Sequence, residues 1–307
     1  MQYRQLGQSG LTVSKVGLGC NQFGRKLDVE STRAVVHTAL EAGITLFDTA
    51  ESYGDGQSER FLGEALKGRR QDAVIATKFG SPHRAPAGWA PGSRRNLRRA
   101  IEGSLSRLQT DYIELYQLHF PDPRTPIEET LAALDEVAKE GKVRYIGCSN
   151  FSGWQVVEAE WIARTQRSTR FISAQNEYSL LNRQVEVELA PACVKYGVGI
   201  LPYFPLANGL LTGKYRRGDP PPANTRLAAR PDALTDDVFQ RLDKLEAFAR
   251  DRGLSLLQVA IGGLAAQPAV GSVISGATSP DQVRANASAG EWTRTPEDLQ
   301  ALNEATL

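Results

Sequence analysis

The sequence has 307 residues, of which 41% are hydrophobic and 23% charged, and its net charge is +1. This length suits one large α/β domain, and we expect a single domain over residues 1–307. The near-neutral charge gives no electrostatic support for binding nucleic acid or an acidic membrane surface, although a local basic site could still bind a small anion. Three dispersed cysteines, an N-terminus without signal character and the lack of a long apolar run predict a cytoplasmic protein with free thiols.

The chain opens with two short alternating runs around Gly7 and Gly10, which predict a β-hairpin. After the hairpin, short apolar runs alternate with amphipathic stretches. The predicted strands are 16–19, 46–48, 74–78, 113–119, 145–149, 173–177, 199–203 and 272–275. The predicted helices are 32–42, 58–66, 96–108, 127–140, 154–165, 185–196, 255–266 and 280–289.

Eight strands that alternate with helices favour parallel strands, right-handed crossovers and closure into a barrel. We therefore expect a (β/α)8 TIM barrel with an N-terminal β-hairpin and a C-terminal helix. The glycines of 17–24 do not fit the pattern of an open nucleotide-binding sheet, and 209–214 is too short for a phosphate-binding P-loop. The loop from Arg216 to Pro231, rich in Pro and Arg, interrupts the alternation of strands and helices and is either mobile or closes over a ligand.

Three consecutive predicted strands end in ionisable residues. Asp48 ends the second strand, Lys78 the third and His119 the fourth, while Tyr53 follows Asp48 in the same loop. Each of them alone has a structural explanation as a turn, a strand end or a packing residue. Catalytic groups of such barrels gather at the carboxyl ends of the strands, so the coincidence of all four predicts an active site.

A phenol, an ammonium, a carboxylate and an imidazole at one rim suit the protonation of a carbonyl oxygen. A free phenol has a pKa of about 10, and a neighbouring ammonium lowers it. We expect Asp48 to keep Lys78 charged, Lys78 to lower the pKa of Tyr53 as the proton donor, and His119 to orient the substrate. The three histidines of the chain are too dispersed to suggest a metal site.

The segment 43–54, which contains Asp48 and Tyr53, resembles the signature of the aldo-keto reductase superfamily. The similarity continues through 146–151, 175–178, 202–215 and 276–286, so it covers nearly the whole chain. The resemblance implies an NADPH-dependent enzyme that transfers hydride to an aldehyde or ketone. It also implies that Asp48, Tyr53, Lys78 and His119 are the catalytic residues.

The resemblance further implies a dinucleotide that lies extended across the strand ends. Its carboxamide would bind Ser149, Asn150 and Gln175, and Tyr203 would stack on the nicotinamide ring. The pyrophosphate and adenosine ends would meet Leu206, Gly209, Lys214, Gly276, Thr278, Gln282 and Asn286. From spacing alone, Ser149 and Asn150 equally suit a turn before a helix, and Gln282 and Asn286 a solvated helix face.

The sequence departs from the family where many members carry Arg or Lys to bind the 2′-phosphate of NADPH. Thr278 and Ser279 stand at this position, and hydroxyls bind a phosphate less strongly than a cation does. Arg284 or Arg226 could compensate. We expect NADPH as the cofactor, with NADH as the alternative.

The aromatic residues Phe23, Trp89 and Phe120 lie in the predicted loops around the site and suggest an apolar or aromatic carbonyl substrate. The sequence indicates neither the substrate itself, nor the direction of the reaction, nor an oligomeric state. Two alternatives remain. One is an NADPH-binding redox sensor that acts through a protein partner, as potassium-channel β subunits of this superfamily do. The other is a Schiff-base aldolase that uses Lys78.

Overall fold

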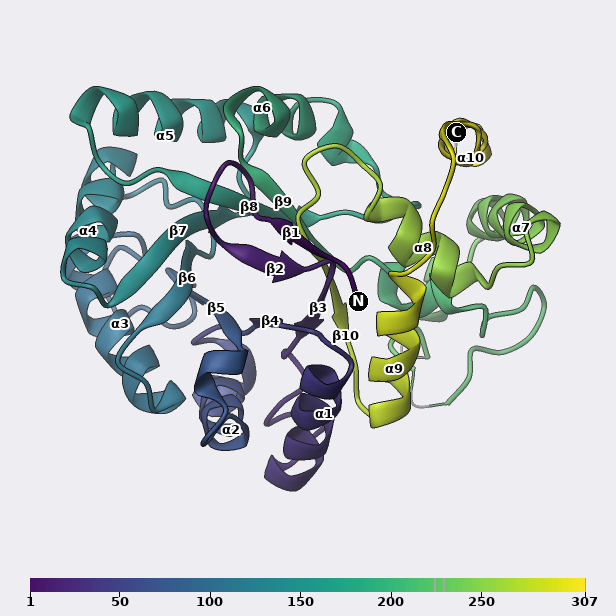
Figure 1. Ribbon diagram of the computed structural model, residues 1–307, viewed down its shortest axis with the longest axis horizontal. Coiled ribbons are helices and arrows are strands. Elements are labelled where there is room, and N and C mark those ends of the chain that lie inside the picture. Colours follow the sequence, from purple (N-terminus) through teal and green to yellow (C-terminus); the bar gives the residue numbers. More distant parts are fainter. Residues whose placement is uncertain (224, 229, 307) are drawn as a thin grey trace.

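The computed structural model describes residues 1–223, 225–228 and 230–306, and its centre is a parallel eight-stranded barrel surrounded by helices (Figure 1). The strand order is β10-β3-β4-β5-β6-β7-β8-β9. The strands are β3 Val16–Gly19, β4 Leu46–Asp48, β5 Val74–Phe79, β6 Ile113–Leu118, β7 Val143–Ser149, β8 Phe171–Glu177, β9 Gly199–Tyr203 and β10 Val273–Gly276. A parallel bridge between Ile200 and Val270 brings β9 back beside β10. The (β/α)8 barrel predicted from the sequence is confirmed.

Helices cover the outside of the barrel, and a C-terminal helix follows them, as predicted. Their bounds are α1 Val29–Glu41, α2 Gln57–Ala65, α3 Arg94–Leu108, α4 Ile127–Lys139, α5 Gly153–Gln166, α6 Leu189–Tyr196, α7 Asp236–Asp251, α8 Leu256–Leu264, α9 Pro280–Ala289 and α10 Pro296–Ala305. The predicted helix 185–196 is shorter in the structure, because a separate 3-10 turn precedes α6. Within the described ranges, no helix combines the length and apolar character needed to cross a bilayer.

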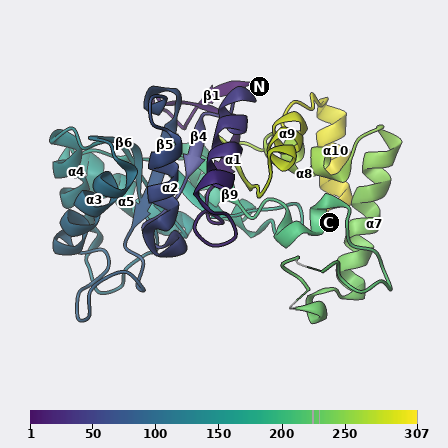
Figure 2. The same cartoon turned by 90° about the horizontal axis from the view of Figure 1, so that it is seen from below.

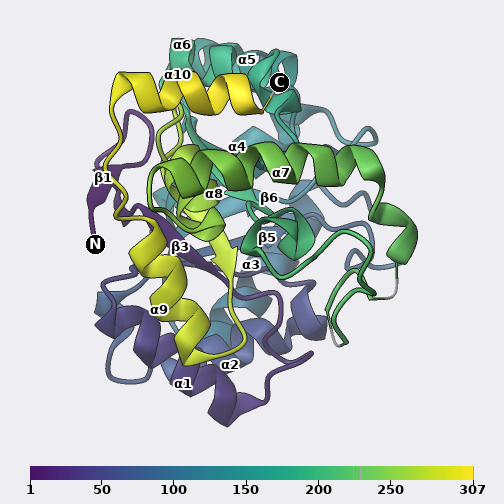
Figure 3. The ribbon, with the colours of Figure 1, turned by 90° about the vertical axis from the view of Figure 1, so that its right-hand side faces the viewer.

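Helix α7 has no counterpart among the helices predicted from the sequence. It follows the Pro-rich loop, begins at the N-cap Thr235 and buries Phe239, Leu242, Leu245 and Phe248 on one face. This spacing of three residues is the pattern of an amphipathic helix, so the signal was present. Helices α7 and α10 lie side by side on one flank of the barrel (Figure 3).

The N-terminal hairpin, β1 Tyr3–Gln5 and β2 Thr12–Ser14, closes one end of the barrel. Leu6 is fully buried there in the small cluster of apolar side chains that also contains Leu46 and Leu115 of the strands. A Cβ atom at Gly199 or Gly271 would lie only 2.6 or 2.4 Å from Cδ1 of Leu6, so the barrel needs glycine where this side chain enters. The hairpin and the long loops after β5 and β9 lie at opposite ends (Figure 2).

The two-residue period of the strands explains which side chains reach the open end. Leu46, Ala76 and Leu115 belong to the cluster inside the barrel. Two residues after Leu46 and Ala76 come Asp48 and Lys78, whose side chains therefore point inward at the next level up. The same period carries β6 from Leu115 to His119, just beyond the strand end.

Candidate active site

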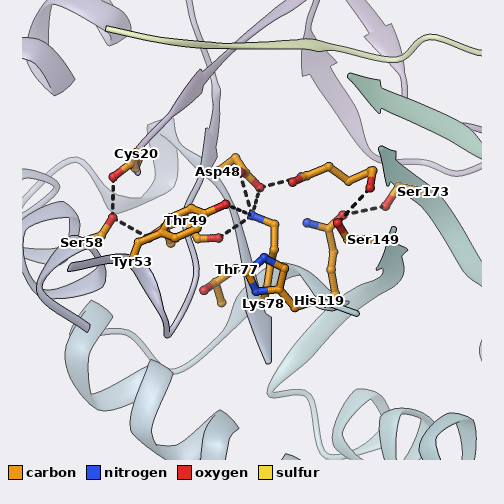
Figure 4. Close-up of polar contacts among 12 residues, drawn as sticks. Cys20, Asp48, Thr49, Tyr53, Ser58, Thr77, Lys78, His119, Ser149 and Ser173 are labelled. Carbon is orange, nitrogen blue, oxygen red and sulfur yellow. Dashed lines mark hydrogen bonds and ion pairs between the residues drawn. The ribbon is translucent and has the colours of Figure 1, made fainter. Parts of the chain in front are cut away.

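The four residues expected to form the active site lie together at the carboxyl end of the barrel (Figure 4). Nζ of Lys78 lies 2.7 Å from Oδ1 of Asp48 and 3.3 Å from the hydroxyl of Tyr53. The ring of His119 is edge-on to the ring of Tyr53, with 6.0 Å between the centroids. The structure therefore brings a carboxylate, an ammonium, a phenol and an imidazole into one site.

Asp48 and Lys78 form a buried ion pair, with exposed fractions of 3% and 0%. Nζ of Lys78 donates to both carboxylate oxygens and to the carbonyl of Thr49, and Nε2 of Gln175 donates to Oδ1 of Asp48 at 2.8 Å. Burial lowers the pKa of Lys78, but the charge of Asp48 and then Tyr53 together hold this pKa above its usual value. Lys78 is therefore an ammonium at neutral pH.

Tyr53 begins the 3-10 turn Tyr53–Gly56 that follows β4. Burial raises the pKa of Tyr53, and this effect outweighs the ammonium of Lys78, which lowers it. The expected influence of Lys78 is present, but the net shift is opposite to the expected one, because the sequence does not show how far the phenol is removed from water. The phenol keeps its proton at neutral pH and is able to donate it.

His119 is neutral in this site. Burial, and then the charge of Lys78, lower the pKa of His119 to about 3. Its ring stacks on Phe120 with 4.5 Å between centroids, and its Nδ1 is buried without a hydrogen-bond partner in the described chain. Since buried polar atoms are normally paired, this nitrogen needs a polar partner that a ligand or a water molecule would provide.

Two hydroxyl groups that sequence reasoning did not identify hold the loop between β4 and α2. The hydroxyls of Thr49 and Ser58 lie 2.8 Å apart, and Ser58 donates to the carbonyl of Cys20 in the loop that follows β3 (Figure 4). Helix α2 begins at Gln57 with Gly56 as its N-cap, so Ser58 does not cap it. Ser58 is instead fully buried beneath the active-site loop.

A cavity of about 650 Å³ opens from the candidate site at Asp48, Tyr53 and His119 across the strand ends. This volume lies within the usual range for sites that bind cofactors and small molecules. Asp48, Tyr53 and His119 line it, whereas Lys78 lies behind them. All the residues expected to bind a cofactor are in its wall: Ser149, Asn150, Gln175, Tyr203, Leu206, Gly209, Lys214, Gly276, Thr278, Gln282 and Asn286.

The polar groups beside these four residues are held in place by one another. The hydroxyl of Tyr203 donates to Oδ1 of Asn150 at 2.8 Å, and Nδ2 of Asn150 donates to the carbonyl of His119. Ser149 donates to the carbonyl of Gln175 at 2.9 Å. Fixed hydroxyl and amide groups of this kind suit a planar carboxamide, which both donates and accepts hydrogen bonds.

The far end of the cavity is built by the N-terminal turn of α9. Ser279 caps this helix, and Oε1 of Gln282 accepts from the backbone N–H of Thr278 at 2.8 Å. Nδ2 of Asn286 points back to the carbonyl of Gly276. Backbone N–H groups at a helix N-terminus favour a phosphate group, so this end suits the phosphate-bearing part of a nucleotide.

Only one of the two arginines considered as partners for a 2′-phosphate lies at this end of the cavity. Arg284 pairs with Asp281 at 3.0 Å on the surface and is not part of the cavity wall. Arg226 is part of the wall, together with Lys214 and Lys26. Of the two arginines considered for a 2′-phosphate, the structure therefore places only Arg226 at the cavity.

Of the three aromatic residues suggested for substrate binding, only Phe120 lines the cavity. Phe23 is fully buried in the hydrophobic core, where its segment turns back to pair with Leu27. Trp89 lies outside the wall beneath the guanidinium of Arg95, 3.8 Å from its ring centroid. The cavity wall contains a second phenylalanine, Phe204, which the sequence did not single out.

The loop from Arg216 to Pro231 is only partly within the described residues, since residues 224 and 229 lie outside them. Arg216 pairs with Glu246, and Arg217 with Asp236 at 2.6 Å, so these arginines are directed to α7 and its start. Thr225 and Arg226 lie in the cavity wall.

Comparisons with known proteins give the same family along nearly the whole chain. The model of the aldo/keto reductase family matches residues 15–306. An uncharacterized oxidoreductase of Bacillus subtilis, YrpG, is 38% identical over 99% of this chain and 95% of its own length. A probable voltage-gated potassium channel subunit beta of Oryza sativa is also 38% identical, over 93% and 90%. The versiconal hemiacetal acetate reductase of Aspergillus parasiticus is 33% identical, over 99% and 96%. This chain belongs to the aldo/keto reductase family of oxidoreductases.

Proposed function

We propose that this protein transfers hydride from NADPH to the carbonyl carbon of an aldehyde or ketone, with Tyr53 as the general acid. The family acts on small carbonyl compounds and generally uses NAD(P)H. One observation carries the proposal: Tyr53 and His119 line a cavity that continues to the helix N-terminus at Thr278, and Lys78 contacts Tyr53 from behind.

His119, Tyr53 and Lys78 have separate roles in the proposed proton transfer. The bound nicotinamide supplies the hydride. Neutral His119 orients the carbonyl, and Tyr53 gives its proton to the carbonyl oxygen as negative charge develops there. Lys78, held by Asp48 and Gln175, stabilises the phenolate that remains.

The cofactor contacts follow the same cavity. Ser149, Asn150 and Gln175 would hold the carboxamide, and Tyr203 would cover one face of the nicotinamide ring. This orientation would fix which ring face meets the substrate, and correct positioning of the reactants raises the rate. Lys214 beside Gly209 would meet the pyrophosphate, and the turn Gly276–Thr278 with Gln282 and Asn286 the adenosine end.

NADPH is the proposed cofactor because the 2′-phosphate would meet both helix N–H groups at α9 and a cation in the wall, Arg226. Arg226→Gln should therefore raise the Kd of NADPH at least tenfold and change the Kd of NADH little. Arg284→Gln is the matched control and should leave both values unchanged. Equal losses for the two cofactors in Arg226→Gln would assign this residue to a shared part of the nucleotide and favour NADH as an equal cofactor.

The decisive test of the catalytic role is Tyr53→Phe. This change should leave the Kd of NADPH, measured by its fluorescence, within about twofold and lower kcat by at least about 100-fold, a typical contribution of a general acid. Tyr116→Phe is the control, because Tyr116 is fully buried, lies outside the cavity wall and has a hydroxyl without a partner in the described chain. Near-normal kcat in Tyr53→Phe across aldehydes and ketones would refute the assignment.

A second function, redox sensing through a protein partner, is favoured by the relative from Oryza sativa, whose name describes a probable channel subunit. The complete set of Asp48, Tyr53, Lys78 and His119 favours turnover instead. Tight NADPH binding without turnover on a broad panel of carbonyl compounds would support the sensor.

An aldolase that uses Lys78 as a nucleophile is disfavoured by the geometry. A Schiff-base lysine reacts as the neutral amine, whereas the charge of Asp48 helps to hold the pKa of Lys78 above its usual value. Borohydride should therefore trap no carbonyl compound on Lys78, as measured by peptide mass spectrometry.

We also propose that the loop from Arg216 to Pro231 closes over the bound pyrophosphate, since Thr225 and Arg226 already lie in the cavity wall. Saturating NADPH should slow cleavage of this loop by trypsin. Unchanged cleavage would mean that the loop stays a surface segment.

A further inference from the structure

A second pocket lies far from the active site, at the end of the barrel that the hairpin closes. Its volume is about 370 Å³. It is formed where the N-terminal strand runs beside the segment that leads into α10 (Figure 3). The residues that line it are Gln2, Lys15, Trp292, Thr293, Arg294, Thr295, Pro296 and Leu299.

Lys15 is the unusual member of this pocket. Only 2% of the residue is exposed, and the sole partner of its ammonium in the described chain is Oε1 of Gln2, at 3.3 Å. Burial, followed by the charges of Arg294 and Arg4, lowers the pKa of Lys15 to about 8. A buried ammonium of this kind is costly unless an opposite charge compensates it.

Two further cations lie beside Lys15, and neither has an acidic partner among the residues that the structure describes. Nη1 of Arg4 donates to the carbonyls of Ala265 and Val270, and Nη2 of Arg294 also donates to the carbonyl of Ala265. These carbonyls lie at and beyond the C-terminal end of α8, a position that favours cations. The two guanidinium groups are thus used for structure, but their charges remain uncompensated.

The nearby acidic groups are directed elsewhere. Glu291 pairs with the N-terminal amino group of Met1 at 3.0 Å. Asp298, in the first turn of α10, pairs with Arg252 at 2.7 Å. Among the residues that the structure describes, no Asp or Glu therefore pairs with Arg4, Lys15 or Arg294.

We propose that this pocket binds a small organic oxyanion, with its phosphate or carboxylate group against Lys15 and Arg294. The hydroxyls of Thr293 and Thr295 in the pocket wall would add neutral donors. The pocket is larger than an inorganic phosphate ion needs, and Trp292 and Leu299 give the remaining space an apolar wall. The ligand class is therefore an anionic head group with a compact apolar body.

An anion at this position would connect the two ends of the chain. Gln2 and Lys15 belong to the N-terminal hairpin and the start of β3, whereas Arg294 and Thr295 precede α10. The bound anion thus stabilises the folded state without touching the catalytic residues at the other end of the barrel. Its effect should appear in thermal stability and not in kcat.

Phenyl phosphate is the probe, with inorganic phosphate and phenol as its two halves, at ionic strength matched with sodium chloride. Phenyl phosphate at about ten times its Kd should raise Tm by roughly 2–4 °C. Inorganic phosphate should bind more weakly, and phenol should not bind. Lys15→Met should weaken binding of phenyl phosphate at least tenfold by calorimetry and abolish the rise in Tm.

Lys214→Met is the matched control, because a phosphate ester could also bind in the cofactor cavity. The proposal requires that Lys214→Met keeps the rise in Tm and that Lys15→Met loses it. The reverse result, equal rises in both variants, or no binding at about 10 mM probe would overturn it. Lys15→Met removes a buried charge and should fold at least as stably as the parent in anion-free buffer, and Arg294→Gln provides a second variant.

Discussion

The buried pair of Asp48 and Lys78 makes a quantitative prediction about stability. At the observed separation of 2.7 Å the two charges attract by about 6 kcal/mol at an effective dielectric constant of about 20. Much of this attraction is offset by the loss of hydration. Removal of one partner, however, leaves the other charge buried and alone, which costs about 3–5 kcal/mol. Lys78→Met and Asp48→Asn should each lower the free energy of unfolding by this amount.

The double variant separates pairing from packing. Lys78→Met combined with Asp48→Asn buries no charge, so it should lose at least about 2 kcal/mol less than the two single losses added together. Urea unfolding followed by circular dichroism measures all four proteins. The exposed pair of Lys142 and Glu102, with N and O atoms 2.6 Å apart, is the matched control. Lys142→Met should cost no more than about 1 kcal/mol.

Two results would refute this reasoning. Losses of less than about 1 kcal/mol in both single variants would show that water reaches the ion pair and that the pair is not buried as described. Additive losses in the double variant would show that Asp48 and Lys78 do not depend on each other. In that case Asp48 could not be the residue that keeps Lys78 charged.

Two further predictions concern pH and helix packing. Folding lowers the pKa of His119 to about 3. Below about pH 6.5 the unfolded chain therefore binds a proton at His119 that the folded chain does not bind. The free energy of unfolding should fall by about 1–2 kcal/mol from pH 7 to pH 5 for this reason. His119→Gln should lose this part of the pH dependence in urea unfolding, whereas His83→Gln in an exposed loop should keep it. A Cβ atom on Gly63 would lie 2.5 Å from the carbonyl oxygen of Leu108, so Gly63→Ala should cost at least about 2 kcal/mol. Gly103→Ala, which meets only a flexible side chain, should cost less, and equal losses would refute the packing argument.

Much of the fold follows from the sequence because the barrel repeats one local rule. Short apolar strands with a period of two fix which residues point inward, and parallel strands bring their carboxyl ends to one rim. For this reason the positions of Asp48, Lys78 and His119 could be inferred from strand ends alone. The same rule does not reach Tyr53, which lies in a turn, and its place rested on proximity to Asp48 and on the family resemblance.

Other features depend on contacts that no local pattern carries. Phe23 and Trp89 lie in loops, where no period fixes the direction of a side chain, and one of them packs into the core while the other stacks beneath Arg95. The raised pKa of Tyr53 depends on how deeply the assembled barrel buries it. The role of Gln175 as a donor to Asp48 joins two strands far apart in the chain.

The hairpin that closes the barrel also constrains the order in which the chain can fold. Leu6 emerges first from the ribosome, yet it packs against Gly199 and Gly271, which are synthesised much later. The packing site of Leu6 does not exist until the last strands have joined the first. The N-terminal segment therefore stays unpacked while the rest of the barrel assembles. The N-terminal hairpin can therefore dock and stabilise the barrel only after the barrel has closed.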